Sequence, residues 1–167
     1  SIRDTARRLW ILYVSLTVVL ALVLAAFGWT GVDERMGLFE AVSYAFSTLP
    51  TGGFAPDPRS VEPFAAASQW VIALFMVIGG INFALLFRAI VRRHPGSIFR
   101  DDELRLYLAL LGIASAAVTV LIWDAGLQEG EAAVRHAVFQ TVSIMTTTGF
   151  ASTDYAVGPQ PRSVAVG

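Results

Sequence analysis

Three long stretches of this 167-residue chain contain no charged side chain. Residues 9–29 give 21 such positions in a row, residues 69–87 give 19 and residues 106–123 give 18. At about 1.5 Å per helical residue, each stretch reaches across a hydrocarbon layer of roughly 30 Å, the third only just. A soluble core has no need of such blocks. The sequence therefore predicts an all-α integral membrane protein.

The composition excludes several other classes of protein. Only 15% of the residues are charged, against about 25% in an ordinary soluble domain. The chain has no cysteine, which excludes a disulfide framework and a thiolate metal site. All 12 basic residues are arginine, but no dense basic stripe is present, so nucleic-acid binding is not expected. The first apolar stretch is too long for a signal-peptide core.

Arginine is distributed unevenly around the apolar stretches. Eight of the twelve arginines precede the first stretch or lie between the second and the third, namely Arg3, Arg7, Arg8, Arg88, Arg92, Arg93, Arg100 and Arg105. Nine of the thirteen acidic residues lie in the two remaining segments, residues 30–68 and 124–167. Because cytoplasmic loops carry the excess of arginine, we expect the N-terminus and the 88–105 loop to be cytoplasmic. The four tryptophans lie near the ends of the apolar stretches, as interfacial belts do: Trp10, Trp29, Trp70 and Trp123.

The first outer segment contains a candidate re-entrant element. Residues 37–48 are typical of a short amphipathic helix, and the run Leu49-Pro50-Thr51-Gly52-Gly53-Phe54-Ala55-Pro56 after it is rich in helix breakers. About twelve helical residues span only ~18 Å, which is too short to cross the membrane. The segment is therefore predicted to enter the membrane and return on the same side.

The sequence repeats itself with a shift of 96 positions, which places the TGGFA of residues 51–55 on the TTGFA of residues 147–151. Ser47 then aligns with Ser143, and the arginine before the first stretch corresponds to the arginine before the third. We expect residues 1–100 to form a complete repeat of spanning helix, re-entrant pore loop and spanning helix. Residues 101–167 are expected to form a second repeat that lacks its final helix. The chain starts at Ser1 and stops in mid-pattern, so it is expected to be an excerpt from a longer protein.

A loop of threonine, glycine and phenylalanine has no ionisable side chain, and its chemistry is that of its backbone. Glycine permits the φ angles that let successive carbonyls point the same way, and threonine adds a hydroxyl oxygen. The short helix before the loop directs the negative end of its dipole at the same place. Carbonyl rings that replace a hydration shell form potassium filters, and Thr-x-Gly-aromatic-small is the pattern they use. Asp57 and Asp154 would add negative potential at the outer mouth.

With these motifs the chain resembles the TrkH/KtrB superfamily of potassium transporters. In that superfamily one chain carries four helix–pore-loop–helix repeats around a single ion path. The resemblance covers essentially the whole chain and is closest to the second repeat and the front part of the third. Three segments carry it, namely residues 45–54 (AFSTLPTGGF), 79–85 (GGINFAL) and 139–150 (FQTVSIMTTTGF). Pro50, just before the first loop threonine, is a minor departure from the family pattern.

The resemblance implies which atoms hold the ion. Backbone carbonyls around six residues would bind potassium, namely Thr51, Gly52, Gly53, Thr147, Thr148 and Gly149. It also implies a multi-pass protein of the bacterial inner membrane, a homodimer, and a cytosolic nucleotide-binding regulatory subunit. No catalytic residue and no cofactor other than K⁺ is expected.

Two other functions stay open as alternatives, a membrane-embedded enzyme and a non-transporting membrane scaffold. An intramembrane enzyme needs convergent ionisable residues, whereas the apolar stretches contain none, and Asn82 is a polar side chain deep in the second stretch. A scaffold leaves the repeated loops without a purpose.

Several single residues have two interpretations each. Asn82 either bonds a neighbouring helix or lines the ion path, and Gly79-Gly80 either permits close helix packing or acts as a hinge. Glu131 and Arg135, four residues apart, are expected to pair locally. Glu40 and His136 occupy equivalent places in the two repeats, and both are expected to position the outer face, with pH sensing by His136 as the alternative.

Overall fold

The computed structural model describes residues 2–81 and 101–153, and this part of the chain is helical without any strand. Five helices make it up: α1 (Ile2–Trp29), α2 (Leu38–Thr48), α3 (Ala66–Gly80), α6 (Asp102–Asp124) and α7 (Gly130–Met145). The all-α prediction is thus confirmed for these residues. Two short helices, α2 and α7, stand where the repeat placed the re-entrant elements.

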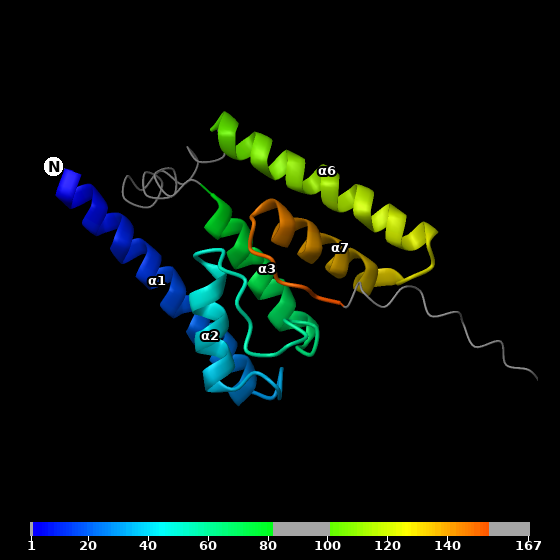
Figure 1. The fold of residues 1–167 in the computed structure, drawn as a ribbon, viewed down its shortest axis with the longest axis horizontal. Helices are drawn as coiled ribbons and strands as arrows, with labels where there is room; N and C mark the ends of the chain where they lie inside the picture. The colour runs from blue at the N-terminus through cyan, green and yellow to red at the C-terminus, as the bar shows by residue number, and fades with distance from the viewer. Residues whose placement is uncertain (1, 82–100, 154–167) are drawn as a thin grey trace, which may run out of the picture.

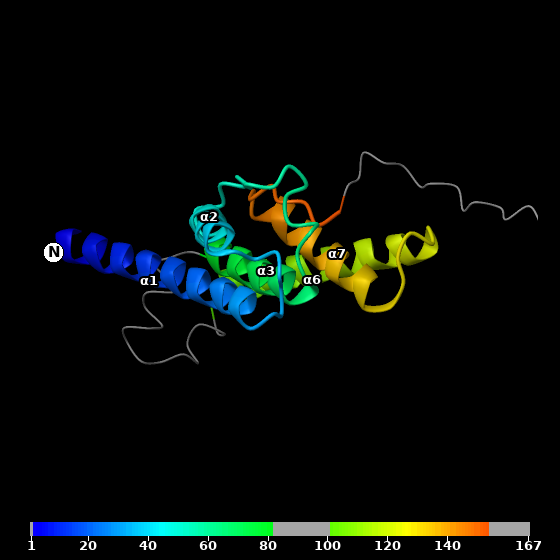
Figure 2. The same cartoon turned by 90° about the horizontal axis from the view of Figure 1, so that it is seen from below.

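The helices form two similar groups that meet in the middle of the molecule. α2 packs against α1 and α3, while α7 packs between α3 and α6 (Figure 1). α1 and α6 run in the same direction and α3 runs in the opposite one, and the two short helices turn back from the far ends of α1 and α6. Figure 2 shows the loops that follow α2 and α7 lying together on one side of the molecule. This arrangement brings together the two TxGFA loops, which are the TGGFA of residues 51–55 and the TTGFA of residues 147–151.

The first and third apolar stretches form helices long enough to span a membrane. α1 has 28 residues and α6 has 23, and their most apolar parts are only 22% and 11% buried. A core helix of a soluble protein is mostly covered by its neighbours, so these exposed apolar surfaces fit lipid contact. The Asp101 side chain caps α6 by accepting hydrogen bonds from the amides of Glu103 (3.1 Å) and Leu104 (3.4 Å).

The second apolar stretch differs from the expected unbroken helix over residues 69–87. α3 ends at Gly80, and Ile81 is extended with ψ 142°. Two consecutive glycines are weak helix formers, which explains a break at this point. Gly79 also allows close packing, because a Cβ there would lie 2.9 Å from the Leu49 carbonyl oxygen. Asn82 and the rest of the stretch lie outside the described residues, as do His94 and Arg88, Arg92 and Arg93.

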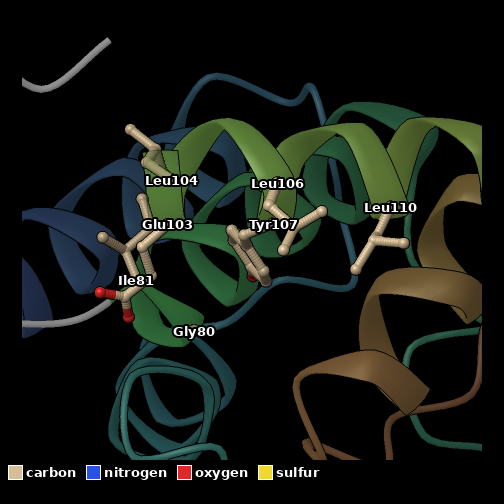
Figure 3. A pocket seen from close by; sticks show the side chains of 7 residues that line it. All are labelled: Gly80, Ile81, Glu103, Leu104, Leu106, Tyr107 and Leu110. Atoms are coloured by element: carbon tan, nitrogen blue, oxygen red, sulfur yellow. The ribbon is translucent and has the colours of Figure 1, made fainter. Parts of the chain in front are cut away.

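The end of α3 and the start of α6 enclose a small pocket of about 290 Å³. Figure 3 shows Tyr107 reaching from α6 towards the end of α3, beside Gly80. The Tyr107 hydroxyl donates a hydrogen bond of 3.2 Å to the Val77 carbonyl. This contact ties the second group of helices to the first at the end of α3, close to Leu49 and Thr146, where the two loops begin.

A buried carboxylate joins the α1–α2 turn to the start of α3. Asp33 is only 4% exposed, and its Oδ2 accepts hydrogen bonds from the Ala65 amide (2.8 Å) and the Ser68 hydroxyl (2.5 Å). Oδ1 accepts a longer bond, 3.3 Å, from the Arg35 amide. A buried charge needs such partners, so Asp33 holds α3 in place against the turn.

Candidate functional site

The two TxGFA loops adopt the same backbone conformation. Thr51 and Thr147 have φ angles of 54° and 59°, and Gly53 and Gly149 have φ angles of 70° and 88°. In each loop, therefore, the threonine and the second residue after it have left-handed backbone angles. An extended strand does not show this alternation. The sequence predicted that glycine would supply such angles, but in each copy one of the two left-handed residues is a threonine. A non-glycine residue in this region costs about 1 to 2 kcal/mol, so both loops carry the same local strain.

The loop amides also make equivalent hydrogen bonds in the two copies. The Gly52 amide donates to the Ser47 carbonyl at 2.8 Å, and the matching Thr148 amide donates to the Ser143 carbonyl at 2.9 Å. The threonine amides donate to the carbonyls of Thr48 (3.1 Å) and Ile144 (3.0 Å) in the same paired way. These bonds satisfy carbonyls that a helix C-terminus leaves free, and they turn the loop N–H groups towards the helix.

The carbonyl oxygens of the same loops have no hydrogen-bond donor among the described residues. Within the described part of the chain, no hydrogen bond ends on the carbonyl oxygen of any of six residues, namely Thr51, Gly52, Gly53, Thr147, Thr148 and Gly149. Backbone carbonyls are strong acceptors that folded proteins almost always satisfy. The two adjacent loops therefore present six backbone acceptors without a donor in the described part of the chain.

The two loops touch each other at Gly53. A Cβ atom at this position would overlap the Thr148 carbonyl oxygen of the other loop. Gly149 also has a positive φ, but a Cβ there would meet no atom within 4 Å among the described residues. The backbone angle thus favours glycine at both positions, and at Gly53 the lack of space for a Cβ requires it as well.

Comparisons with known proteins agree with this geometry. A profile of the TrkH family, described as "Cation transport protein", matches residues 1–160. The chain is 35% identical to the Trk system potassium uptake protein TrkH of Halomonas elongata over 159 residues, and 31% identical to that of Escherichia coli K12 over 160 residues. Each match covers 95% of this chain. The chain belongs to the TrkH family.

The TrkH family is a family of membrane transport proteins and not a class of enzymes. Among solved structures, the chain matches the potassium transporter TrkH of Vibrio parahaemolyticus with a TM-score of 0.78 and 32% identity over 91% of its length. It spans about a third of its relatives, since each of these matches covers 32% of the relative. The family and the fold expected from the sequence motifs are therefore confirmed.

In this TrkH-family chain the two loops differ at the phenylalanine. Phe150 is fully buried and its carbonyl accepts a 2.7 Å bond from the Ser143 hydroxyl. Phe54 is 82% exposed, and the buried Ser47 hydroxyl has no partner among the described residues. The second loop is therefore anchored to its own helix at one more point than the first.

The segment after the first loop holds the second loop from outside. The Ser60 hydroxyl accepts a 3.1 Å bond from the Ala151 amide, and the Val61 amide donates a 3.1 Å bond to the Ala151 carbonyl. Sequence reasoning missed these residues. The Asp57-Pro58 pair predicts a turn, and the Asp57 side chain does accept from the Arg59 amide at 2.8 Å. No sequence signal, however, connects that turn with a partner about ninety residues away.

A polar network joins α3 to the outer end of α7. The predicted Glu131–Arg135 pair is present, with 3.1 Å between Glu131 Oε1 and Arg135 Nε. Glu131 also accepts a 2.8 Å bond from Trp70 Nε1, and Arg135 donates to the Gln69 side chain. The hydrogen bond from Trp70 lowers the pKa of Glu131, and the positive charge of Arg135 lowers it further. Trp70, expected only as an interfacial residue, thus links the two helices.

Other predicted site residues lie outside the two loops. Asp57 lies beyond the first loop, but Arg59 lies 3.7 Å from its carboxylate and offsets the negative charge expected there. Glu40 lies in the first turn of α2. His136 lies in α7, where its Nδ1 is 3.0 Å from the Ser152 hydroxyl. Asp154 lies outside the described residues.

Proposed function

We propose that this chain forms part of a potassium-uptake pore in which backbone carbonyls bind the ion. The proposed ligands are the carbonyl oxygens of Thr51, Gly52, Gly53, Thr147, Thr148 and Gly149. The observation that carries the proposal is that these oxygens accept no hydrogen bond among the described residues, while five of the six amides donate to carbonyls at the ends of α2 and α7. Carbonyl oxygens can replace the hydration shell of potassium, and the C-termini of α2 and α7 add partial negative charge.

Potassium is proposed as the ion because the Halomonas elongata and Escherichia coli relatives are named potassium uptake proteins. It would be cargo that passes through the loops and not a resident cofactor. Within the described residues no group of three acidic, histidine or cysteine side chains could hold a metal, so the carbonyls are the ligands that this part of the chain offers.

The arrangement we propose has two repeats, residues 1–100 and 101–167, in the inner membrane of a bacterium as a multi-pass unit. The N-terminus and the segment before α6 would be cytoplasmic, which is supported by the arginines there. A homodimer and a cytosolic nucleotide-binding regulatory subunit are proposed on the family resemblance. Two loops cannot close a ring alone, so uptake is proposed for the complete gene product and not for these 167 residues in isolation.

The proposal is tested by substituting alanine at the glycines of both loops. In the complete gene product, Gly149→Ala forces a Cβ into a left-handed position without a steric overlap, and Gly53→Ala adds the overlap with Thr148. We expect both variants to lose preference for potassium over sodium, and Gly53→Ala to lose more of its uptake. The measurement is ⁸⁶Rb⁺ uptake, with sodium as competitor, in an Escherichia coli strain that lacks its own potassium-uptake systems.

Gly112→Ala is the matched control, because a Cβ on this α6 glycine meets no described atom and its φ is not positive. This variant should transport as the parent does. Unchanged uptake and ion preference in both loop variants, at normal membrane abundance, would refute the assignment of the ligands.

A further inference from the structure

The segment between the first loop and α3 has contacts that its position as a connection does not require. We call residues 57–64 the outer strap. At its centre Ser60 is left-handed, with φ 56°, and it is neither glycine nor asparagine. This strained turn directs the Ser60 hydroxyl and the Val61 amide at Ala151, the last residue of the second loop motif. Both backbone polar groups of Ala151 are therefore held by the first repeat.

Tyr44 on α2 supports the outer strap from below. Its hydroxyl donates a 2.6 Å hydrogen bond to the Ser60 carbonyl, and its ring is fully buried. The Tyr44 ring packs edge-on against Phe64, with 5.2 Å between the ring centroids. It also packs against Phe150 at a tilt, with 5.5 Å between the centroids. One side chain thus contacts the strap and the second loop at the same time, and such aromatic pairs add to the stability that burial gives.

Gln69 on α3 supports the same strap from the other side. Its Nε2 donates to the carbonyls of Val61 (3.0 Å) and Phe64 (3.2 Å), and its Oε1 accepts from Arg135 on α7. Gln69 is only 2% exposed. A buried amide with all these partners holds its neighbours firmly. The strap is thus fastened to α2 and α3, and through Gln69 to the helix that carries the second loop.

We propose that Tyr44 and Ser60 are positioning residues that set the spacing between the two loops and thereby the ion preference of the pore. This inference rests on the proposed function. A carbonyl filter discriminates by the size of its cavity and by the field of its oxygens. The Ala151 bonds fix the outer end of the second loop relative to the first, so their loss changes the cavity without removing a ligand.

Two variants test the proposal in the complete gene product. Ser60→Gly removes the hydroxyl that accepts from Ala151 and relieves the left-handed strain, so the turn itself remains favourable. Tyr44→Phe keeps the ring and removes only the hydroxyl that supports Ser60. Each variant should raise the KM for ⁸⁶Rb⁺ about fivefold, which is the factor that one net hydrogen bond supplies. The preference for ⁸⁶Rb⁺ over sodium should decrease, while the maximal uptake rate per transporter in the membrane is retained.

The double variant Tyr44→Phe/Ser60→Gly shows whether the two residues act through one path. If they do, the double variant has about the KM of the single variants, because coupled residues are not additive. KM changes that multiply would overturn the shared path.

Arg59→Lys is the control within the strap, because it keeps the positive charge beside Asp57, and among the described residues no hydrogen bond or ion pair joins the Arg59 side chain to either loop. It should transport as the parent does. A parental KM and ion preference in both Ser60→Gly and Tyr44→Phe, while Gly149→Ala loses preference, overturns the positioning role and leaves the proposed ligands standing. Parental behaviour of Gly149→Ala as well overturns the proposed function and this inference with it.

Discussion

At the scale of single residues, the two loops repeat one backbone conformation, and side chains hold it in place. Thr51 and Thr147 take the same left-handed angle in loops that lie 96 positions apart. Identical strain in both copies indicates a conformation that each loop needs, because a strained angle persists only where its surroundings enforce it. The supporting side chains are buried and hydrogen-bonded, and Asp33 shows most clearly what one of them contributes.

Asp33→Ala should lower the stability of the chain in detergent micelles. The substitution leaves the Ala65 amide and the Ser68 hydroxyl without their buried acceptor, a loss of about 2 kcal/mol. Glu34→Ala, at the exposed neighbouring position, should change stability by less than about 0.5 kcal/mol. The check is the thermal unfolding midpoint of both variants. Equal midpoints would show that Asp33 does not anchor α3.

The sequence predicted those features that repeat locally and missed those that depend on distant contacts. Uncharged length predicted α1 and α6, and the match between residues 51–55 and 147–151 predicted two loops of one kind. Ser60 could not be found in this way, because its partner is a backbone amide 91 residues away and backbone groups leave no pattern in side chains. The early end of α3 has a local cause that the uncharged length did not reveal, because Gly79 and Gly80 are weak helix formers within an apolar stretch.

At the scale of helices, the group of α1, α2 and α3 is joined to the group of α6 and α7 at both ends of α3. The start of α3 bonds to α7, and the Tyr107 hydroxyl of α6 bonds to the end of α3. α3 is the element common to both groups, since it packs against α1, α2 and α7. Its outer end carries Gln69 and Trp70, which reach Arg135 and Glu131 on α7. A shift of α3 would therefore move both loops together, which keeps their spacing constant.

The Glu131–Trp70 link should make the stability of the chain depend on pH. The pKa of Glu131 is lowered on folding from about 4.5, so the folded state binds its proton less readily than the unfolded state does. Its stabilising contribution is therefore present above pH 4.5 and is lost as the pH falls through the lower folded value. Glu131→Gln should lower the unfolding midpoint at pH 7, and the difference from the parent should shrink in acid.

Glu129→Gln is the matched control, because the Glu129 side chain does not cap α7. Its unfolding midpoint should follow that of the parent at every pH. A Glu131→Gln deficit that is equally large at pH 7 and in strong acid would contradict the assignment to the ionised carboxylate.

At the scale of the whole molecule, α1 and α6 run the same way, so the two groups of helices have the same orientation. Repeats that follow each other in this way place equivalent loops on the same side of a membrane. Inverted repeats would instead place successive loops on opposite sides.

The absence of cysteine from this chain makes its orientation directly measurable. Single cysteines at Glu34 and Leu127, beyond α1 and α6, should react with a membrane-impermeant maleimide in intact spheroplasts. Cysteines at Arg3 and Arg105 should react only after lysis, because arginine-rich ends are expected to be cytoplasmic. Labelling of Arg105→Cys together with Glu34→Cys in intact spheroplasts would contradict the parallel repeats.

The bonds between Ala151 and the outer strap also have a consequence for biosynthesis. Ser60 and Val61 leave the ribosome well before Ala151, because synthesis proceeds from the N-terminus. The groups of the first repeat that bind Ala151 are thus already synthesised when the second loop closes. A defect in the strap would therefore appear first as slow maturation of a loop that belongs to the following repeat.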